Sequence, residues 1–378
     1  MTAIWRTQAL LQTVARDELA RPRFAYLDPE CQRWEFDGRQ SSVTAIKTVV
    51  NNCVTEAERV FAEDLLLGYL LESFNLPSLA SIVDNLNRTE TGYSFLTDDV
   101  NMLYRFENAL ICRVMNDEDE ERAHTFHSGV SDGKLLYKAA ACRRFLEAGQ
   151  SFLALYATAC HMSHGQPSRG MELFTATWRT VGNSQVSFRI SDGEVYLCIY
   201  FHKPDTMKGH QFLVPYFQCA RLSLLGVAYM VLVRPLEIRF ARLTCPAAAS
   251  VYNTHIFVGP SGRWQTRHLT MAIEKHTEPV LGFKLDTRSM RQVLIFILHK
   301  HAGASFLQPD REYEEEDDPQ ELMALQTFNA VGDFMAAHAV GTARGEYGIE
   351  MRTVGAMPEE KLRQIRFVSM GERKLTVY

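Results

Sequence analysis

The hydrophobic pattern of the chain changes its period between Gln185 and Phe217, and this change constrains the fold more than any other feature. Three short runs, QVSFRI, VYLCIYFHK and QFLVPYF, are rich in β-branched and aromatic residues, and polar turn sequences separate them. Such runs predict short strands joined by hairpins. Three consecutive strands of this kind would form a small antiparallel meander.

Helical patterns lie on both sides of this meander. Apolar residues recur at intervals of three and four over 57–74, 134–162 and 286–303. This spacing is typical of helices with one buried face. Shorter helices are expected over 75–88, in NLPSLASIVDNLNR, and over Met171–Trp178. The sequence therefore predicts a mainly α fold with a small antiparallel β-meander, which belongs to the α+β class.

The length of the chain predicts more than one domain. It has 378 residues, of which 46% are apolar, and this is enough for two buried cores. Segment 117–133, DEDEERAHTFHSGVSDG, is polar and turn-rich, so we expect it to be an acidic linker. The predicted division is a helical N-terminal domain over 1–116, this linker, and a second domain over 134–378.

The acidic residues are unevenly distributed. The net charge of −5 is opposite to that of a typical nucleic-acid binder, but two clusters, at 117–122 and 310–321, hold 13 acidic residues and two arginines. Outside them the chain carries 38 Lys and Arg against 32 Asp and Glu. Either a basic face or a nearly neutral surface with two solvated acidic loops agrees with this distribution.

Cysteine and apolar patterns set further expectations. The eight cysteines are scattered without CxxC pairs, so neither disulfides nor a metal site is predicted, and a reducing compartment fits best. His161, His164, His202, His210 and His268 match no common ligand spacing, so we expect structural or surface roles and no metal or other cofactor. The longest apolar run, Leu222–Val233, is too short to span a bilayer, which predicts a soluble, intracellular protein without a membrane partner.

Five residues could together cleave a DNA strand. Such a reaction needs a nucleophilic hydroxyl, cations that hold the phosphate oxygens, and an acid that protonates the leaving oxygen. Tyrosine, with a pKa of about 10, can serve as the nucleophile, arginine forks fit phosphate, and lysine can donate the proton. In chain order the candidates are Arg169, Lys203, Arg291, His338 and Tyr347.

Four phrases of the sequence resemble the tyrosine recombinase (phage integrase) superfamily: RGMEL, FHK, RSMR and HAVGTARGEY, in which nine positions separate His338 from Tyr347. The resemblance is closer to integrase-like domains joined to RecQ-like helicases in fungi, which are related to crypton recombinases. It covers about 134–352. No Walker G-x-x-x-x-G-K-[ST] motif occurs, and FVGPSGR lacks the lysine, so we expect no helicase motor in this chain.

The resemblance implies a tyrosine-recombinase-like catalytic domain after a helical, core-binding-like domain. Tyr347 would attack the scissile phosphate and form a 3′-phosphotyrosyl link, Arg169, Arg291 and His338 would stabilise the transition state, and Lys203 would be the general acid. Further DNA contacts would come from His202, Lys208, Arg288 and Arg344. The implied partner is double-stranded DNA, bound by a dimer or tetramer in the nucleus, in the integration or recombination of a mobile element.

Two departures from the family pattern keep other interpretations open. Arg288 stands where the H-x-x-R motif has its histidine, and an acidic insertion separates Arg291 from His338. A catalytically degenerate DNA-binding module, associated with a helicase or with telomeres, is the alternative function. A third interpretation is a protein-contact role without DNA.

Each predicted site residue also has a structural alternative. Arg169 could pair with Glu172, Lys208 is a rival for the role of Lys203, and His338 and Tyr347 could be packing residues. Arg291 could pair with an acidic residue on a helix face, namely Glu274, Glu278 or Asp286.

Overall fold

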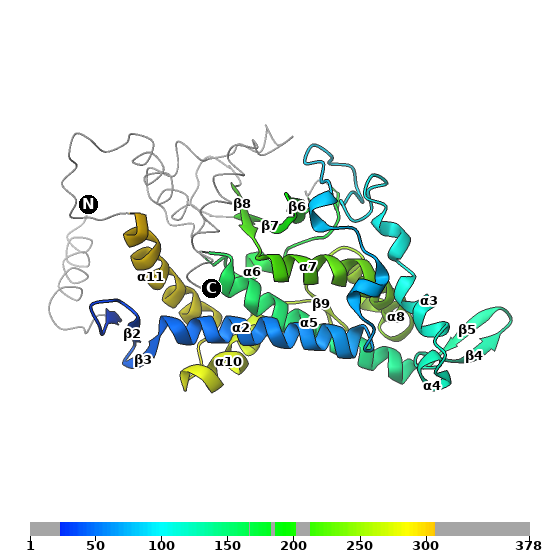
Figure 1. The fold of residues 1–378 in the computed structure, drawn as a ribbon, viewed down its shortest axis with the longest axis horizontal. Coiled ribbons are helices and arrows are strands. Elements are labelled where there is room, and N and C mark those ends of the chain that lie inside the picture. Colours follow the sequence, from blue (N-terminus) through cyan, green and yellow to red (C-terminus); the bar gives the residue numbers. More distant parts are fainter. Residues whose placement is uncertain (1–22, 166, 183–185, 202–211, 307–378) are drawn as a thin grey trace, which may run out of the picture.

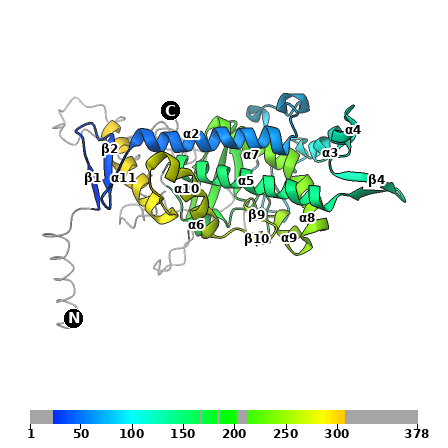
Figure 2. The ribbon, with the colours of Figure 1, turned by 90° about the horizontal axis from the view of Figure 1, so that it is seen from below.

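A computed structural model describes residues 23–165, 167–182, 186–201 and 212–306. Two long helices, α2 (Val43–Val60) and α5 (Ala139–Ser163), lie side by side along the length of an elongated molecule (Figures 1 and 2). Small antiparallel sheets accompany the helices. The predicted α+β class is therefore confirmed, whereas the likeness to a recombinase domain stays a prediction.

Most of the remaining helices and all of the strands are short. The other helices are α3 (Ala109–Met115), α4 (Glu120–Ala123), α6 (Gly170–Leu173), α7 (Ala220–Ala228), α8 (Arg234–Thr244), α9 (Pro246–Tyr252), α10 (Thr266–Leu281) and α11 (Thr287–Phe306). Of these, α10 and α11 are of a length similar to α2. The strands are β1 (Phe24–Tyr26), β2 (Arg33–Phe36), β3 (Arg39–Ser42), β4 (His127–Ser131), β5 (Lys134–Tyr137), β6 (Phe188–Ser191), β7 (Glu194–Phe201), β8 (Phe212–Phe217), β9 (Val258–Gly259) and β10 (Gly262–Arg263). Single 3₁₀ or π-helical turns cover Phe61–Leu65, Leu71–Phe74, Leu79–Ser81, Leu103–Phe106 and Tyr229–Val233.

The predicted meander is confirmed as the sheet β6-β7-β8, in which each strand is antiparallel to the next. Asp192 (φ 49°) and Gly193 (φ 78°) form the turn between β6 and β7. Positive φ at both central residues is the geometry that a two-residue hairpin requires. The second loop of the meander, which carries His202, Lys203 and Lys208, lies outside the described residues.

The predicted long helices are confirmed in part. α11 covers the expected segment, and α5 begins only after β5, which the helical pattern over 134–162 did not predict. In segment 57–74, where a helix was expected throughout, the α-helix ends at Val60. The prediction of a helix over 75–88 is wrong, because this segment contains a single 3₁₀ turn at Leu79–Ser81 instead. Asn75 has φ 53°, a left-handed conformation that ends a helical path. The helix expected over Met171–Trp178 ends at Leu173.

The N-terminal part contains a sheet that the helical prediction missed. β1, β2 and β3 form an antiparallel sheet whose second turn has Asp37 at φ 49° and Gly38 at φ 78°. This Asp-Gly pair between strand-like runs is a hairpin signal in the sequence itself. The sheet lies against α11, where Phe296 stacks on Phe24 at 4.8 Å and on Tyr26 at 4.4 Å between ring centroids.

One continuous set of buried side chains joins residues before and after the predicted linker. Phe61, at the end of α2, contacts Phe152 of α5 at 5.7 Å between ring centroids. Segment 117–133 contains α4, β4 and the buried Phe126, which packs against Phe145 and Phe240. The division of the chain at this segment stays a prediction.

Candidate functional site

Of the nine residues proposed from the sequence, the structure describes Arg169, Arg288 and Arg291. His202, Lys203 and Lys208 fall within 202–211, and His338, Arg344 and Tyr347 fall within 307–378, so these six lie outside the described residues. The roles assigned to them stay predictions.

All three described arginines line one cleft of about 520 Å³. Arg169 precedes α6, whereas Arg288 and Arg291 lie one turn apart on α11, so the fold brings together cations that are far apart in the sequence. The other lining residues are Gly170, Met171, Glu172, Thr175, Thr266 and Thr287. Glu172 is the only acidic residue among the described lining residues, so positive charge prevails in this cleft.

The N-termini of three helices meet at this cleft. α6 begins at Gly170, α10 at Thr266 and α11 at Thr287, and all three residues line it. A Cβ atom at Gly170 would lie 2.9 Å from Cγ2 of Thr266 and 3.3 Å from Cγ2 of Thr287, so the helices approach closely here. The N-terminal ends of α10 and α11 contribute partial positive charge and add to that of the arginines.

Arg169 is held by its own helical turn. Its backbone N–H donates to Oε2 of Glu172 at 3.2 Å, and its Nη1 lies 3.8 Å from Oε1 of the same residue. The pairing with Glu172 that the sequence suggested therefore exists, but at a long distance. Because the side chain is 45% exposed, its guanidinium can still reach a bound anion.

Arg291 is more buried and is fixed by the loop before α6. Its Nε–H donates to the carbonyl oxygen of Pro167 at 2.9 Å. Burial lowers the pKa of the Arg291 guanidinium, Tyr216 opposes this shift, and the positive charge of Arg169 adds to it. Arg291 therefore presents a partly desolvated cation close to a second one. A phosphate between them would relieve the repulsion.

Two buried polar side chains belong to the elements around Arg291. Burial lowers the pKa of His161 from 6.5 to about 3, and the charge of Arg291 acts in the same direction. Neither ring nitrogen of His161, nor the hydroxyl of Ser168, has a hydrogen-bond partner among the described residues. His161 is therefore a neutral, buried histidine at physiological pH, in keeping with the structural role expected for it.

Sequence reasoning missed Thr266 and Thr287 as cleft residues. Each is the first residue of its helix, and the two helices are connected through a hydrogen bond between the hydroxyls of Thr270 and Thr287 at 2.8 Å. A helix start can be read from a sequence, but the meeting of three starts at one place depends on the tertiary packing.

Among the described residues, no helix is long and apolar enough to cross a bilayer, and no three His, Cys, Asp or Glu side chains gather as a metal site would require. In comparisons with known proteins, no protein-family model matches the sequence, and no solved structure matches the chain.

Proposed function

We propose that the chain is a DNA-binding, tyrosine-recombinase-like protein that cleaves and rejoins DNA strands through a 3′-phosphotyrosyl intermediate. One observation carries the proposal. Arg169 and Arg291, chosen from the sequence as phosphate ligands, line the same cleft at the N-termini of α10 and α11. Two planar guanidinium groups beside helix N-termini suit an anion with several oxygen atoms, such as a phosphodiester.

In the proposed reaction the phenol of Tyr347 gives up its proton to water, and its oxygen forms a bond to phosphorus while the bond from phosphorus to the 5′ oxygen breaks. Lys203 supplies the proton that the departing oxygen takes up. Arg169 and Arg291 neutralise the charge that develops on the non-bridging oxygens, and His338 assists them. The reverse attack by the 5′ hydroxyl rejoins the strand and releases the tyrosine.

The proposal includes a biological setting. The substrate is double-stranded DNA, the acting unit is a dimer or tetramer on that DNA, and the site of action is the nucleus. Integration or recombination of a mobile element is the process that this chemistry serves. The sequence resemblance supports these features, and the arginine cleft supports only the binding of a phosphate.

A covalent trapping experiment tests the chemistry. A nicked duplex loses a short fragment after cleavage, so religation fails and the DNA–protein adduct accumulates. We expect the wild-type chain to form an adduct that survives denaturing electrophoresis, and Tyr347→Phe to form none while still binding DNA. Tight binding of the same duplex by the wild type without any adduct would contradict the proposed cleavage.

A degenerate DNA-binding module is the second candidate, and Arg288 favours it. This residue lines the cleft as an exposed, permanent cation where the family pattern has a histidine that can exchange a proton. If Arg288 prevents strand cleavage, the wild type should form no adduct and Arg288→His should form one. If the chain is active as it stands, the same variant should form adducts at a comparable or higher rate.

A further inference from the structure

A second basic cleft, of about 230 Å³, is lined by other helices and segments than the first cleft. It is bounded by α8, by the segment from Leu96 to Asn108, and by Trp178 and Arg179. No lining residue is shared with the cleft of Arg169 and Arg291. Its floor contains the apolar side chains of Leu103, Met230 and Ile238.

Four arginines line this second cleft, and one of them is neutralised. Arg234 is fully buried, with its Nε 3.1 Å from Oε2 of Glu237 and its Nη2 donating to the carbonyl oxygen of Ile256 at 2.6 Å. Arg179, Arg239 and Arg242 form no ion pair with any described residue. Glu107 is the only acidic residue in the described lining. The cleft therefore holds excess positive charge.

Arg179 has the strongest unmet need for an anion. Its Nε is buried and has no hydrogen-bond partner among the described residues, and burial lowers the pKa of its guanidinium. The guanidinium lies over the ring of Trp178, 3.8 Å from the centroid. An aromatic face stabilises the plane of a cation, but it does not satisfy the N–H groups at the edge of that plane. A buried N–H group such as Nε–H of Arg179 is costly to leave without an acceptor, and an anion in the cleft would provide one.

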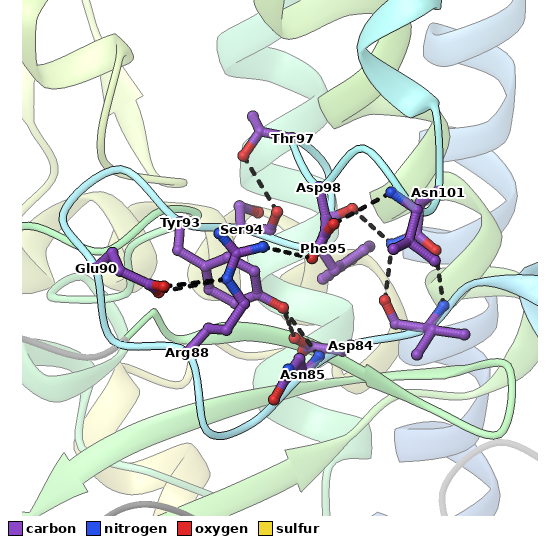
Figure 3. A network of polar contacts seen from close by, with 12 residues as sticks. Asp84, Asn85, Arg88, Glu90, Tyr93, Ser94, Phe95, Thr97, Asp98 and Asn101 are labelled. Atoms are coloured by element: carbon purple, nitrogen blue, oxygen red, sulfur yellow. Dashed lines mark hydrogen bonds and ion pairs between the residues drawn. The ribbon is translucent and has the colours of Figure 1, made fainter.

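The backbone around Arg179 is fixed before any ligand binds. The backbone N–H of Trp178 donates to the carbonyl oxygen of Thr254 at 3.0 Å, and its indole N–H donates to the carbonyl oxygen of Tyr252 at 3.2 Å. The backbone N–H of Thr180 donates to the carbonyl oxygen of Tyr93 at 2.8 Å. Figure 3 shows that Tyr93 and Thr97, the latter a lining residue, belong to one hydrogen-bonded loop. Residues on both sides of the cleft are thus positioned in advance, which reduces the entropy lost on binding.

We propose that this second cleft binds the phosphate group of a small, soluble phosphomonoester, with Arg179, Arg239 and Arg242 as its cationic ligands. Arginine forks match phosphate oxygens, and the apolar floor suits a compact organic group. The volume of the cleft is below that of typical drug-sized pockets, which favours a small ligand over a long one. A duplex backbone would instead need an open surface.

Calorimetric titration of inorganic phosphate into the full chain, at constant ionic strength, tests this inference. We expect saturable binding that Arg179→Gln weakens about tenfold or more, since charge-assisted hydrogen bonds are lost. Arg242→Gln should also weaken it, and this exposed substitution keeps the test valid if Arg179→Gln does not fold. Arg144→Gln, an exposed arginine of α5, is the matched control and should bind as the wild type does.

Two further experiments distinguish phosphate binding at this cleft from phosphate binding elsewhere on the protein. Arg288→Gln alters the first cleft and should leave the binding that depends on Arg179 in place. Ribose 5-phosphate should displace inorganic phosphate, whereas an unphosphorylated duplex should not. Three results would each overturn the inference: no saturable binding, binding by both Arg179→Gln and Arg242→Gln that equals that of the wild type, or displacement of phosphate by the duplex but not by ribose 5-phosphate. None of these outcomes depends on adduct formation at Tyr347.

Discussion

At the scale of single residues, the candidate site contains charged groups that are only partly solvated, and this affects how strongly it binds an anion. Arg291 is half-buried, donates to the Pro167 carbonyl and lies close enough to Arg169 to be repelled by it. His161, behind it, is fully buried in its neutral form. Cations kept in such surroundings are stabilised when an anion enters, which makes binding of a phosphate favourable.

The buried state of His161 predicts a pH dependence of stability. Because its folded pKa of about 3 lies below the unfolded value of 6.5, the unfolded chain takes up a proton first as the pH falls. The folded state therefore loses stability relative to a variant without this group, by about 2 kcal/mol between about pH 8 and about pH 5.

His161→Leu, of similar size and without a titrating group, should remove this loss. Urea unfolding of both proteins at several pH values measures the difference in free energy of unfolding. His255 and His276 also have lowered pKa values owing to burial, so only the difference between the two proteins reports on His161. A difference that stays constant with pH would show that His161 takes up its proton equally readily in the folded and the unfolded chain, which would contradict the prediction.

At the scale of secondary-structure elements, the candidate site depends on how closely α6, α10 and α11 approach. Gly170 permits this approach, because a Cβ there would lie 2.9 Å from the Thr266 methyl group. Thr266 cannot easily move, since a β-branched side chain has few rotamers and begins a helix. The position of Arg169 relative to Arg291 therefore depends on a glycine at position 170.

Gly170→Ala should destabilise the fold by about 1–3 kcal/mol through overpacking, and it should weaken DNA binding at the same time. Adding Thr266→Ser removes the methyl group that the new Cβ would meet, so the double variant should recover most of both losses. Thermal unfolding and DNA affinity measure the effect. Equal stability of wild type and Gly170→Ala would show that the helices can separate without cost.

The sequence predicted α11 and the meander because their patterns were long or punctuated by turn residues. It did not predict β1–β3, although the pair Asp37 and Gly38 marked the hairpin, because the neighbouring helical pattern was stronger. The expected helix after Arg169 was too long, since Phe174 and Trp178 pack as parts of an irregular segment. The meeting of helix N-termini at the cleft is a tertiary feature without a local signal.

At the scale of the whole molecule, a buried ion pair attaches the irregular segment 82–101 to the meander. Nη1 of Arg189, on β6, lies 2.9 Å from Oδ1 of Asp84, and their side chains are 3% and 1% exposed. Tyr93 also donates its hydroxyl to Asp84 at 2.9 Å (Figure 3). The same segment carries Leu96 and Thr97, which line the second cleft.

Asp84→Ala should lower the free energy of unfolding by about 3–5 kcal/mol, because it leaves the Arg189 cation buried without its partner. Glu90→Ala is the control from the same loop. Its side chain is 63% exposed and 3.4 Å from Arg88, so its loss should leave the free energy of unfolding nearly unchanged. Similar effects of the two substitutions, in denaturant unfolding, would contradict the role assigned to Asp84.

The central claim is that the cleft of Arg169, Arg288 and Arg291 binds the DNA backbone, which both candidate functions require. The most direct test is the affinity for duplex DNA over a range of salt concentrations. We expect the affinity to fall steeply with salt, and Arg291→Gln should bind about tenfold more weakly, with a log–log slope smaller by about 0.9. Arg169→Gln should behave in the same way, and Arg144→Gln should match the wild type. Binding that is insensitive to salt, or that both cleft substitutions leave unchanged, would contradict the claim.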